Sequence, residues 1–239
     1  MVSSVSIPDA ARLLKLSPAR VRLLASRGEI PATKIAGRWV IELDAVERRL
    51  RESHPEGRRF TPRNAWGALI LASGENPQLD SVIRSRLKRA LLLEGLTGLA
   101  PRLRERAKVV LYRSHPGEIP YVFEDGALMR SGISAAGSVG SELLAGREAD
   151  GYVPEAEIRN FLSRHALSPV AGDAAANVRL RVVPDDVWSN LDLTGRSIAP
   201  KAAVALDLAG ERDPRSRTAG EKLLREIDGE NQKNLTRRR

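Results

Sequence analysis

Cysteine is absent from this chain of 239 residues. Its absence excludes disulfide bonds, thiolate metal sites and cysteine nucleophiles. Long apolar runs are missing as well: the longest, such as 68–72, have five residues, whereas a helix that spans a bilayer needs about 20. The first residues show neither the basic start nor the apolar stretch of a secretory signal. We therefore expect a soluble, cytoplasmic protein with no membrane partner.

Histidine is scarce, and the residue types that enzymes use are not grouped. The chain has three histidines, His54, His115 and His165. None of them has a spacing typical of metal ligands. Two acidic pairs, at 155/157 and 185/186, resemble those that hold Mg²⁺ in nucleases, but each falls at a turn or helix start, where acidic residues are favoured anyway. No phosphate-binding glycine loop or serine nucleophile motif is present. We expect no catalytic residue, metal site or cofactor, and the chain is predicted not to be an enzyme.

The positive charge is unevenly distributed. With 42% apolar and 29% charged residues the chain is expected to fold, and its net charge is +9. Counted by segment, the net charge is +5 in 1–62, +3 in 63–129, −2 in 130–228 and +3 in 229–239. Such asymmetry suggests an N-terminal part that faces a polyanion, joined to a part with another task. A solvated basic surface is the simpler alternative at this point.

The first fifty residues contain two short helix signals. Ser6 and Asp9 form an S-x-x-D start around Pro8, which suits the first helical turn because proline lacks an N–H. Ser17 and Pro18 repeat the signal, and Gly28 is a typical residue just beyond a helix end. Two short helices separated by about three residues predict a helix-turn-helix unit.

The next segment changes to a strand period. Two runs, 32–35 and 38–41, flank Ala36 and Gly37, a pattern that favours a β-hairpin wing. Asp44 then caps an expected third helix over 45–51. The predicted order is helix, turn, helix, wing, helix, and it defines a domain over residues 1–51.

This unit resembles the winged helix-turn-helix of the excisionase and MerR type. The stretches that carry the resemblance are 7–14, 16–22, 27–32 and 37–41. The resemblance implies that the second helix enters the major groove of double-stranded DNA and that the wing lies along the flanking backbone. On this basis Ser17, Arg20 and Arg22 face DNA, together with Lys34 and Arg38 of the wing.

Helical spacing supports the same surface independently. Val21 and Leu24 mark the buried stripe of helix 17–27, which leaves Arg20, Arg27 and one side of Arg22 in solvent. Arginine suits bidentate bonding to phosphate or guanine. Ser17 at the helix start can offer a hydroxyl and backbone N–H groups to a phosphate. The expected partner is the protein's own promoter, and a homodimer would let two such units read paired half-sites.

Residues 52–62 contain two prolines and a glycine without apolar periodicity and predict a linker.

Residues 63–228 predict a mixed, mainly helical domain with a small β-sheet, so the fold class is α+β. Helical patterns are 64–72, 77–93, 102–107, 119–123, 133–139, 155–165, 200–208 and 214–227, and strand patterns are 109–112, 151–154 and 178–183, the last expected to be half exposed. The polar tail 229–239 is expected to be disordered and basic.

The second domain resembles another group, the actinobacterial antitoxins of the abortive-infection AbiEi type. The stretches that carry this resemblance are 62–66, 131–136, 151–154, 177–183, 199–208 and 212–220. The resemblance implies an antitoxin that represses its own operon and neutralises a nucleotidyltransferase-like toxin of the AbiEii type, with or without direct contact. Two alternatives stay open: a transcriptional regulator whose C-terminal domain senses a ligand or dimerises, and a nuclease aimed by the wing.

Overall fold

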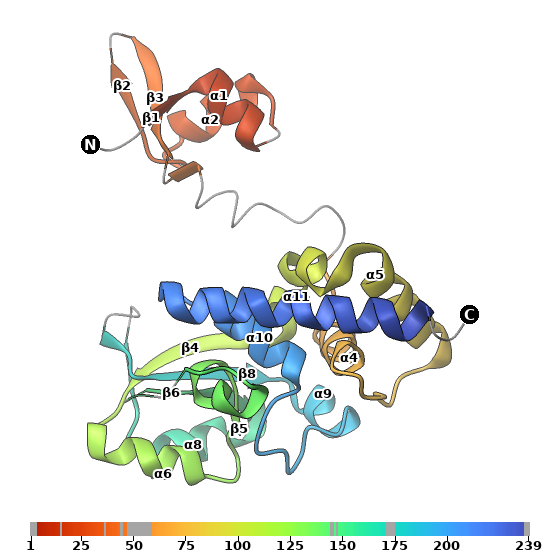
Figure 1. Ribbon diagram of the computed structural model, residues 1–239. Coiled ribbons are helices and arrows are strands. Elements are labelled where there is room, and N and C mark those ends of the chain that lie inside the picture. Colours follow the sequence, from red (N-terminus) through yellow and green to blue (C-terminus); the bar gives the residue numbers. More distant parts are fainter. Residues whose placement is uncertain are drawn as a thin grey trace. The chain divides into compact units, whose positions relative to one another are not determined.

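Figure 1 shows the computed structural model of the chain. The structure describes residues 4–14, 16–35, 37–43, 45–46, 59–143, 146, 148–170 and 175–236. The chain divides into two compact units, Met1–Glu56 (unit 1) and Gly57–Arg239 (unit 2), and each is described by itself. Both helices and small sheets are present, so the α+β class is confirmed.

Unit 1 contains the helices α1 and α2 and a three-stranded antiparallel sheet, and the described residues 43, 45 and 46 are also helical. Its elements are β1 (Ser4–Ser6), α1 (Ile7–Leu14), α2 (Pro18–Ser26), β2 (Ala32–Ile35) and β3 (Arg38–Glu42). The sheet order is β1-β3-β2. Strand β1 was not predicted, because three residues are too few to show a strand period. The core is formed by buried apolar side chains, among them Ile7, Leu14, Val21, Leu24, Ile30 and Ile41, and Val5 of β1 and Ala32 of β2 pack against it.

Local signals place the turns of unit 1 as predicted. The Ser17 hydroxyl caps α2 by accepting from the Arg20 N–H at 3.2 Å. Gly28 after α2 and Gly37 in the hairpin have φ of +69° and +79°, a backbone region that glycine enters without steric penalty. Of the third helix predicted over 45–51, only residues 45 and 46 lie within the described part of the chain.

Unit 2 is a mixed sheet between two sets of helices (Figure 1). Its strands are β4 (Lys108–Arg113), β5 (Met129–Arg130), β6 (Ala149–Pro154), β7 (Ser168–Pro169) and β8 (Val178–Val183). Its helices are α4 (Pro62–Ala72), α5 (Ser81–Leu99), α6 (Ile119–Glu124), α7 (Gly132–Ala135), α8 (Ile158–Arg164), α9 (Asp185–Asn190), α10 (Lys201–Ala209) and α11 (Pro214–Thr236). Short 3-10 turns cover 100–106, 116–118, 137–139 and 155–157.

The sheet order is β5-β6-β8-β4-β7, with β6 and β8 parallel and the other pairs antiparallel. Side chains alternate between its two faces. Val178 and Leu180 of β8 pack with Phe161 of α8, while Val183 packs with the helices α4 and α10 on the other face. The expectation that 178–183 is half exposed is therefore wrong. β8 is covered on both faces, and its arginines are held by ion pairs described below.

The start and the end of α5 both differ from the sequence prediction: a neighbouring cap sets the start, and a distant residue supports the helix beyond its break. The helix predicted over 77–93 begins at Ser81, where Asp80 accepts from the Val82 N–H at 2.8 Å, and it continues past a break at Gly95 to Leu99. At that break Asp228 of α11 accepts from the N–H groups of Leu96 at 2.5 Å and Thr97 at 3.2 Å. A carboxylate 130 residues away thus restarts the helix.

The expected disorder is wrong for residues 229–236, and the expected linker end at 62 also needs correction. Helix α11 continues to Thr236, because Asn231 donates to the Ala72 carbonyl at 3.2 Å and Glu230 lies 3.7 Å from Lys201. Residues 237–239 lie outside the described part. At the other end of unit 2, Thr61 caps α4, which begins at Pro62, so these two residues belong to the helix start rather than to a linker. Residues 52–58 lie outside the described part.

Candidate nucleic-acid interface and the charged centre of unit 2

Helix α2 is held on the core by one side and carries its cations on the other. Val21, Leu24 and Ala25 are buried, while Arg20, Arg22 and Arg27 are exposed. This is the division that helical spacing predicted. Ser17 is also exposed, and its oxygen is engaged by the cap, so what it retains for a ligand is its hydroxyl proton.

The two wing residues lie on opposite faces of the hairpin. Lys34 pairs with Trp39 across the ribbon, and Ile35 pairs with Arg38. Neighbouring pairs in a hairpin point to opposite faces, so Lys34 shares the face of Ile41, which is buried in the core, and Arg38 shares the outer face. Both cations are exposed. The wing can therefore present cations to a phosphate backbone from both of its faces.

The cations of α2 and of the wing are largely uncompensated among the residues that the structure describes. Among the described residues, Arg20, Arg22, Lys34 and Arg38 make no ion pair, and Arg27 has a 3.9 Å contact with Glu29 in which both side chains are at least 45% exposed. An exposed pair of this kind contributes little. These side chains remain able to bind phosphate oxygens or guanine edges. Their role in DNA contact stays a prediction, which the geometry permits.

Unit 2 holds a buried cluster that we call the arginine–carboxylate network. Its members are Arg106, Asp150, Arg179, Arg181, Asp207 and Glu211. Asp207 has no exposed side-chain surface; it pairs with Arg106 and lies 3.0 Å from Arg181 Nε. Arg181 also pairs with Asp150, and Arg179 pairs with Glu211. Three cations and three carboxylates balance, so their mutual attraction offsets part of the penalty of burying each charge.

Aromatic and polar side chains close the network on the side of α4. Arg106 Nε donates to the Tyr152 hydroxyl at 2.8 Å, and Trp66 Nε1 donates to the Arg106 carbonyl at 3.0 Å. The rings of Trp66 and Tyr152 meet edge to face with centroids 4.7 Å apart. Ser131 donates to Asp207. The polar atoms of Trp66, Ser131 and Tyr152 therefore have hydrogen-bond partners, as buried polar groups require. The Asp150 carboxylate oxygens and Arg181 Nη1 make ion pairs but no hydrogen bond.

The charges reinforce one another electrostatically. Burial alone would raise the pKa of the Asp207 carboxyl, but attraction to Arg181 and Arg106 and the hydrogen bond from Ser131 outweigh it, and the pKa is lowered. Burial is also the main reason that the pKa of the Tyr152 hydroxyl is raised. Both groups therefore keep their usual charge at neutral pH: a carboxylate at Asp207 and a neutral phenol at Tyr152.

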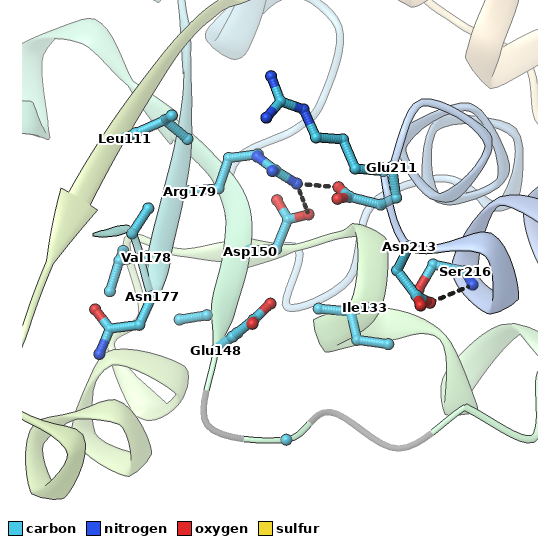
Figure 2. Close-up of a pocket in the computed structure, with 14 residues that line it drawn as sticks. Leu111, Ile133, Glu148, Asp150, Asn177, Val178, Arg179, Glu211, Asp213 and Ser216 are labelled. Carbon is cyan, nitrogen blue, oxygen red and sulfur yellow. Dashed lines mark hydrogen bonds and ion pairs between the residues drawn. The ribbon is translucent and has the colours of Figure 1, made fainter. Parts of the chain in front are cut away.

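A pocket of about 460 Å³ lies beside the network (Figure 2). Arg179 reaches between Glu211 and Asp150, at 3.9 Å from the latter. Asp213 lines the pocket while accepting from the Ser216 N–H at 2.7 Å, which caps α11. The pocket is thus lined by apolar side chains, such as Leu111, Ile133 and Val178, together with charged groups that already have structural partners.

Sequence reasoning missed the network entirely. Two signals were available. Arg179 and Arg181 occupy alternate positions in an otherwise apolar strand, and Asp207 stands alone in the apolar helix 202–208. A charge within an apolar run indicates a buried ion pair, because an unpaired one would be too costly. What sequence could not supply is the partner, since Arg106, Asp150 and Asp207 are far apart along the chain.

No helix within the described ranges is both long and apolar enough to cross a bilayer. Within the same ranges no three histidine, aspartate or glutamate side chains are grouped so as to hold a metal ion. His165, for example, is buried with its Nδ1 3.0 Å from Glu118 and its Nε2 2.9 Å from Asp125, an arrangement that holds α8 against α6.

Comparison with known families identifies unit 1. Residues 4–54 match the family described as the helix-turn-helix domain, in agreement with the predicted order of helices and wing. No curated protein and no solved structure matches the chain.

Proposed function

We propose that this DNA-binding regulator represses its own operon and acts as the antitoxin of a nucleotidyltransferase-like toxin of the AbiEii type. That the chain is a DNA-binding regulator follows from its helix-turn-helix domain. Repression of its own operon and neutralisation of a toxin are more specific claims than DNA binding. They are supported by the resemblance of unit 2 to AbiEi-type antitoxins. They are also supported by the contacts among the residues that carry this resemblance.

Those residues converge on one place. Trp66, Ser131, Tyr152, Arg181 and Asp207 belong to five different stretches of the resemblance, and each contacts another of the five across unit 2. Short sequence stretches spread over about 150 residues would not meet by chance around one buried centre. Their convergence is the observation that carries the proposal, because it makes the stretches parts of a single folded unit.

On the DNA side, the proposal places α2 in the major groove with Arg20 and Arg27 toward phosphates and Arg22 toward a phosphate or a guanine edge. Ser17 adds its hydroxyl at the helix start, and Lys34 and Arg38 contact the flanking backbone. A single small unit reads few base pairs, so we propose that two copies bind paired half-sites about one helical turn apart.

Electrophoretic mobility shifts on the upstream region test the DNA half. Arg20→Ala should weaken binding to all sequences alike if it contacts phosphate, whereas loss of a base contact by Arg22→Ala should relax discrimination at one position by about 1–3 kcal/mol. Arg225→Ala, an exposed arginine on α11 of unit 2, is the matched control. Unchanged binding by an Arg20→Ala/Arg22→Ala double variant would remove α2 from the interface.

On the toxin side, helix α5 offers a surface suited to another protein. Val82 and Leu93 are 62% and 74% exposed, and Arg86 and Arg89 between them are exposed without an ion pair among the described residues. At about 100° per residue these four side chains fall within roughly 60° of the helix circumference. We call them the α5 stripe.

The α5 stripe favours an acidic protein partner over a second copy of itself. Two copies packed antiparallel would place Val82 against Leu93 and Arg86 against Arg89, so that like charges face one another, which is destabilising. Nucleic acid would use the arginines and leave the apolar ends exposed. A protein with carboxylates between apolar side chains would pair with the arginines and cover the apolar ends. We propose that the toxin supplies this surface.

Co-expression with the adjacent gene tests the toxin half. The growth defect caused by that gene should disappear when this chain is present, and undiminished toxicity would refute neutralisation. A double variant, Arg86→Glu/Arg89→Glu, should lose capture of the toxin at least tenfold, whereas Lys222→Glu/Arg225→Glu, with the same charge change on exposed α11 positions, should not. Equal capture by both variants would show that the stripe is not the contact.

The 460 Å³ pocket favours the second candidate function, a regulator whose C-terminal unit senses a ligand. That function predicts operator release on addition of a metabolite and no toxic neighbour. In either case we propose a protein that acts by binding and not by catalysis. Supercoiled DNA left intact after prolonged incubation with Mg²⁺ or Mn²⁺ is the expected result, and cleavage that tracks with the purified chain would contradict it.

A further inference from the structure

The exposed face of α2 is not uniformly polar. Ala19 and Leu23 are both exposed, and the Leu23 side chain retains 38% of its accessible surface. At about 100° per residue, Leu23 lies roughly 40° from Ala19 around the helix. Arg22 lies about 60° to one side of Ala19, and Arg20 and Arg27 lie about 80–100° to the other. The face therefore has an apolar centre, which we call the α2 ridge (Ala19 and Leu23), with cations on both sides.

The ridge points outward and has no free hydrogen-bond donor of its own. Val21, Leu24 and Ala25 are buried on the opposite side of the helix, which fixes its rotation. Ser26 shares the exposed face, but its hydroxyl donates to the Leu23 carbonyl at 2.9 Å. The centre of the face therefore presents methyl and methylene groups.

Double-stranded DNA offers one matching surface. In the major groove the C5 methyl of thymine is the apolar group on the base edges, and phosphates line both rims. A ridge flanked by arginines fits that cross-section, with the cations at the rims and the apolar centre at the floor. The minor groove shows only polar base-edge groups, so it provides no partner for Leu23.

We propose that the α2 ridge reads thymine methyl groups, and that Leu23 is a specificity-determining residue of the operator contact. The inference rests on the DNA-binding function and goes beyond it by naming the chemical group that is recognised. It predicts a thymine in each half-site at the position opposite Leu23, next to the position contacted by Arg22.

Uracil substitution isolates the methyl group. A duplex is selected for tight binding from a randomised library, and each thymine is then replaced singly by uracil, which removes the methyl and keeps every hydrogen-bonding group. Binding of the full-length protein is measured by fluorescence anisotropy. For the wild type we expect one or two adjacent positions at which uracil weakens binding by about fourfold, the value of burying one methyl group.

Variants complete the test. Leu23→Ala should bind the thymine and uracil duplexes equally, while Leu13→Ala, which truncates a leucine of α1 that is 44% exposed, should keep the wild-type discrimination. Circular dichroism checks that both variants are folded.

Three results would overturn the inference. Tight binding by the wild type with no sensitivity to any uracil would leave DNA binding intact and refute the ridge. A change of oligomeric mass in Leu23→Ala with discrimination unchanged would make Leu23 a protein contact instead. Failure to select any duplex would refute the DNA-binding function together with the inference.

Discussion

Gly95 offers the sharpest test of how the two ends of unit 2 are joined. Its backbone has φ of +67° and ψ of 168°, a region that only glycine occupies readily and that costs another residue about 1–3 kcal/mol. A Cβ at this position would lie 3.0 Å from Asp228 Oδ2 and 3.1 Å from its Cγ. In the Gly95→Ala variant the carboxylate would therefore have to move away from the N–H groups that it caps.

The two effects add to an estimate of the loss. Weakening a helix cap costs about 0.5–2 kcal/mol, so with the backbone strain Gly95→Ala should lower the free energy of unfolding by about 1.5–5 kcal/mol. For a unit of this size each kcal/mol shifts the melting temperature by about 2–4 °C, which gives a fall of about 10 °C. Differential scanning calorimetry of the full chain measures it.

Gly98 supplies the matched control three residues further along the same helix. It has no positive φ, and its added Cβ would meet only Glu94 Cβ at 3.4 Å. Gly98→Ala should be neutral or stabilising by up to about 1 kcal/mol, because alanine loses less conformational entropy in a helix. The two substitutions therefore have opposite predicted signs. If Gly95→Ala were as stable as Gly98→Ala, the account of a helix restarted by Asp228 would be wrong.

Other predictions address the network, the helix crossing and the DNA contact. Asp207→Asn should lower the free energy of unfolding by about 3–5 kcal/mol in urea denaturation, because it leaves Arg106 without its buried carboxylate; a loss below 1 kcal/mol would contradict this. Because the pKa of Asp207 is lowered in the folded state, the stability it contributes is present above its unfolded value of about 3.9 and is lost as the pH falls through the folded value. The acid side of the wild-type stability curve should therefore be steeper than that of Asp207→Asn. Gly220→Ala should destabilise by about 3 kcal/mol, the upper end for an overpacked site, since its Cβ would lie 2.2 Å from the Ala209 nitrogen where α10 crosses α11. Gly229→Ala, with open space around it, should not destabilise. Arg20→Ala should reduce the slope of log K against log salt by about one, and an unchanged slope would argue against a phosphate contact.

The local signals of unit 1 were sufficient to predict α1, α2 and the hairpin in their order, but not the three-residue strand β1. Ser17 with Pro18, Gly28 and Gly37 act within a few residues of themselves, through a cap or a permitted backbone angle. The exposure of Arg20, Arg22 and Arg27 followed from the spacing of Val21 and Leu24. The opposite faces of Lys34 and Arg38 depend on the pairing of β2 with β3, which spacing within either strand does not reveal.

Unit 2 shows where sequence reasoning ends. The pattern of 178–183 predicted a strand correctly but assigned its arginines to solvent. An alternating pattern is usually interpreted as a strand with one face in solvent and the other in the core. The polar face of β8 meets Asp207 and Asp150 instead. The tail after 228 was expected to be disordered because it is polar, yet contacts with Lys201 and Ala72 carry the helix onward.

The amino-acid sequence by itself therefore determined the helix-turn-helix unit, its turns and its exposed cations, because caps, glycine conformations and helical periodicity are interactions between near neighbours. Only the tertiary structure decided which charges of unit 2 are buried in pairs, where Asp228 restarts α5, and that Leu23 is left exposed between arginines. Those features depend on which distant segments are brought together, and that is settled by packing of the whole fold.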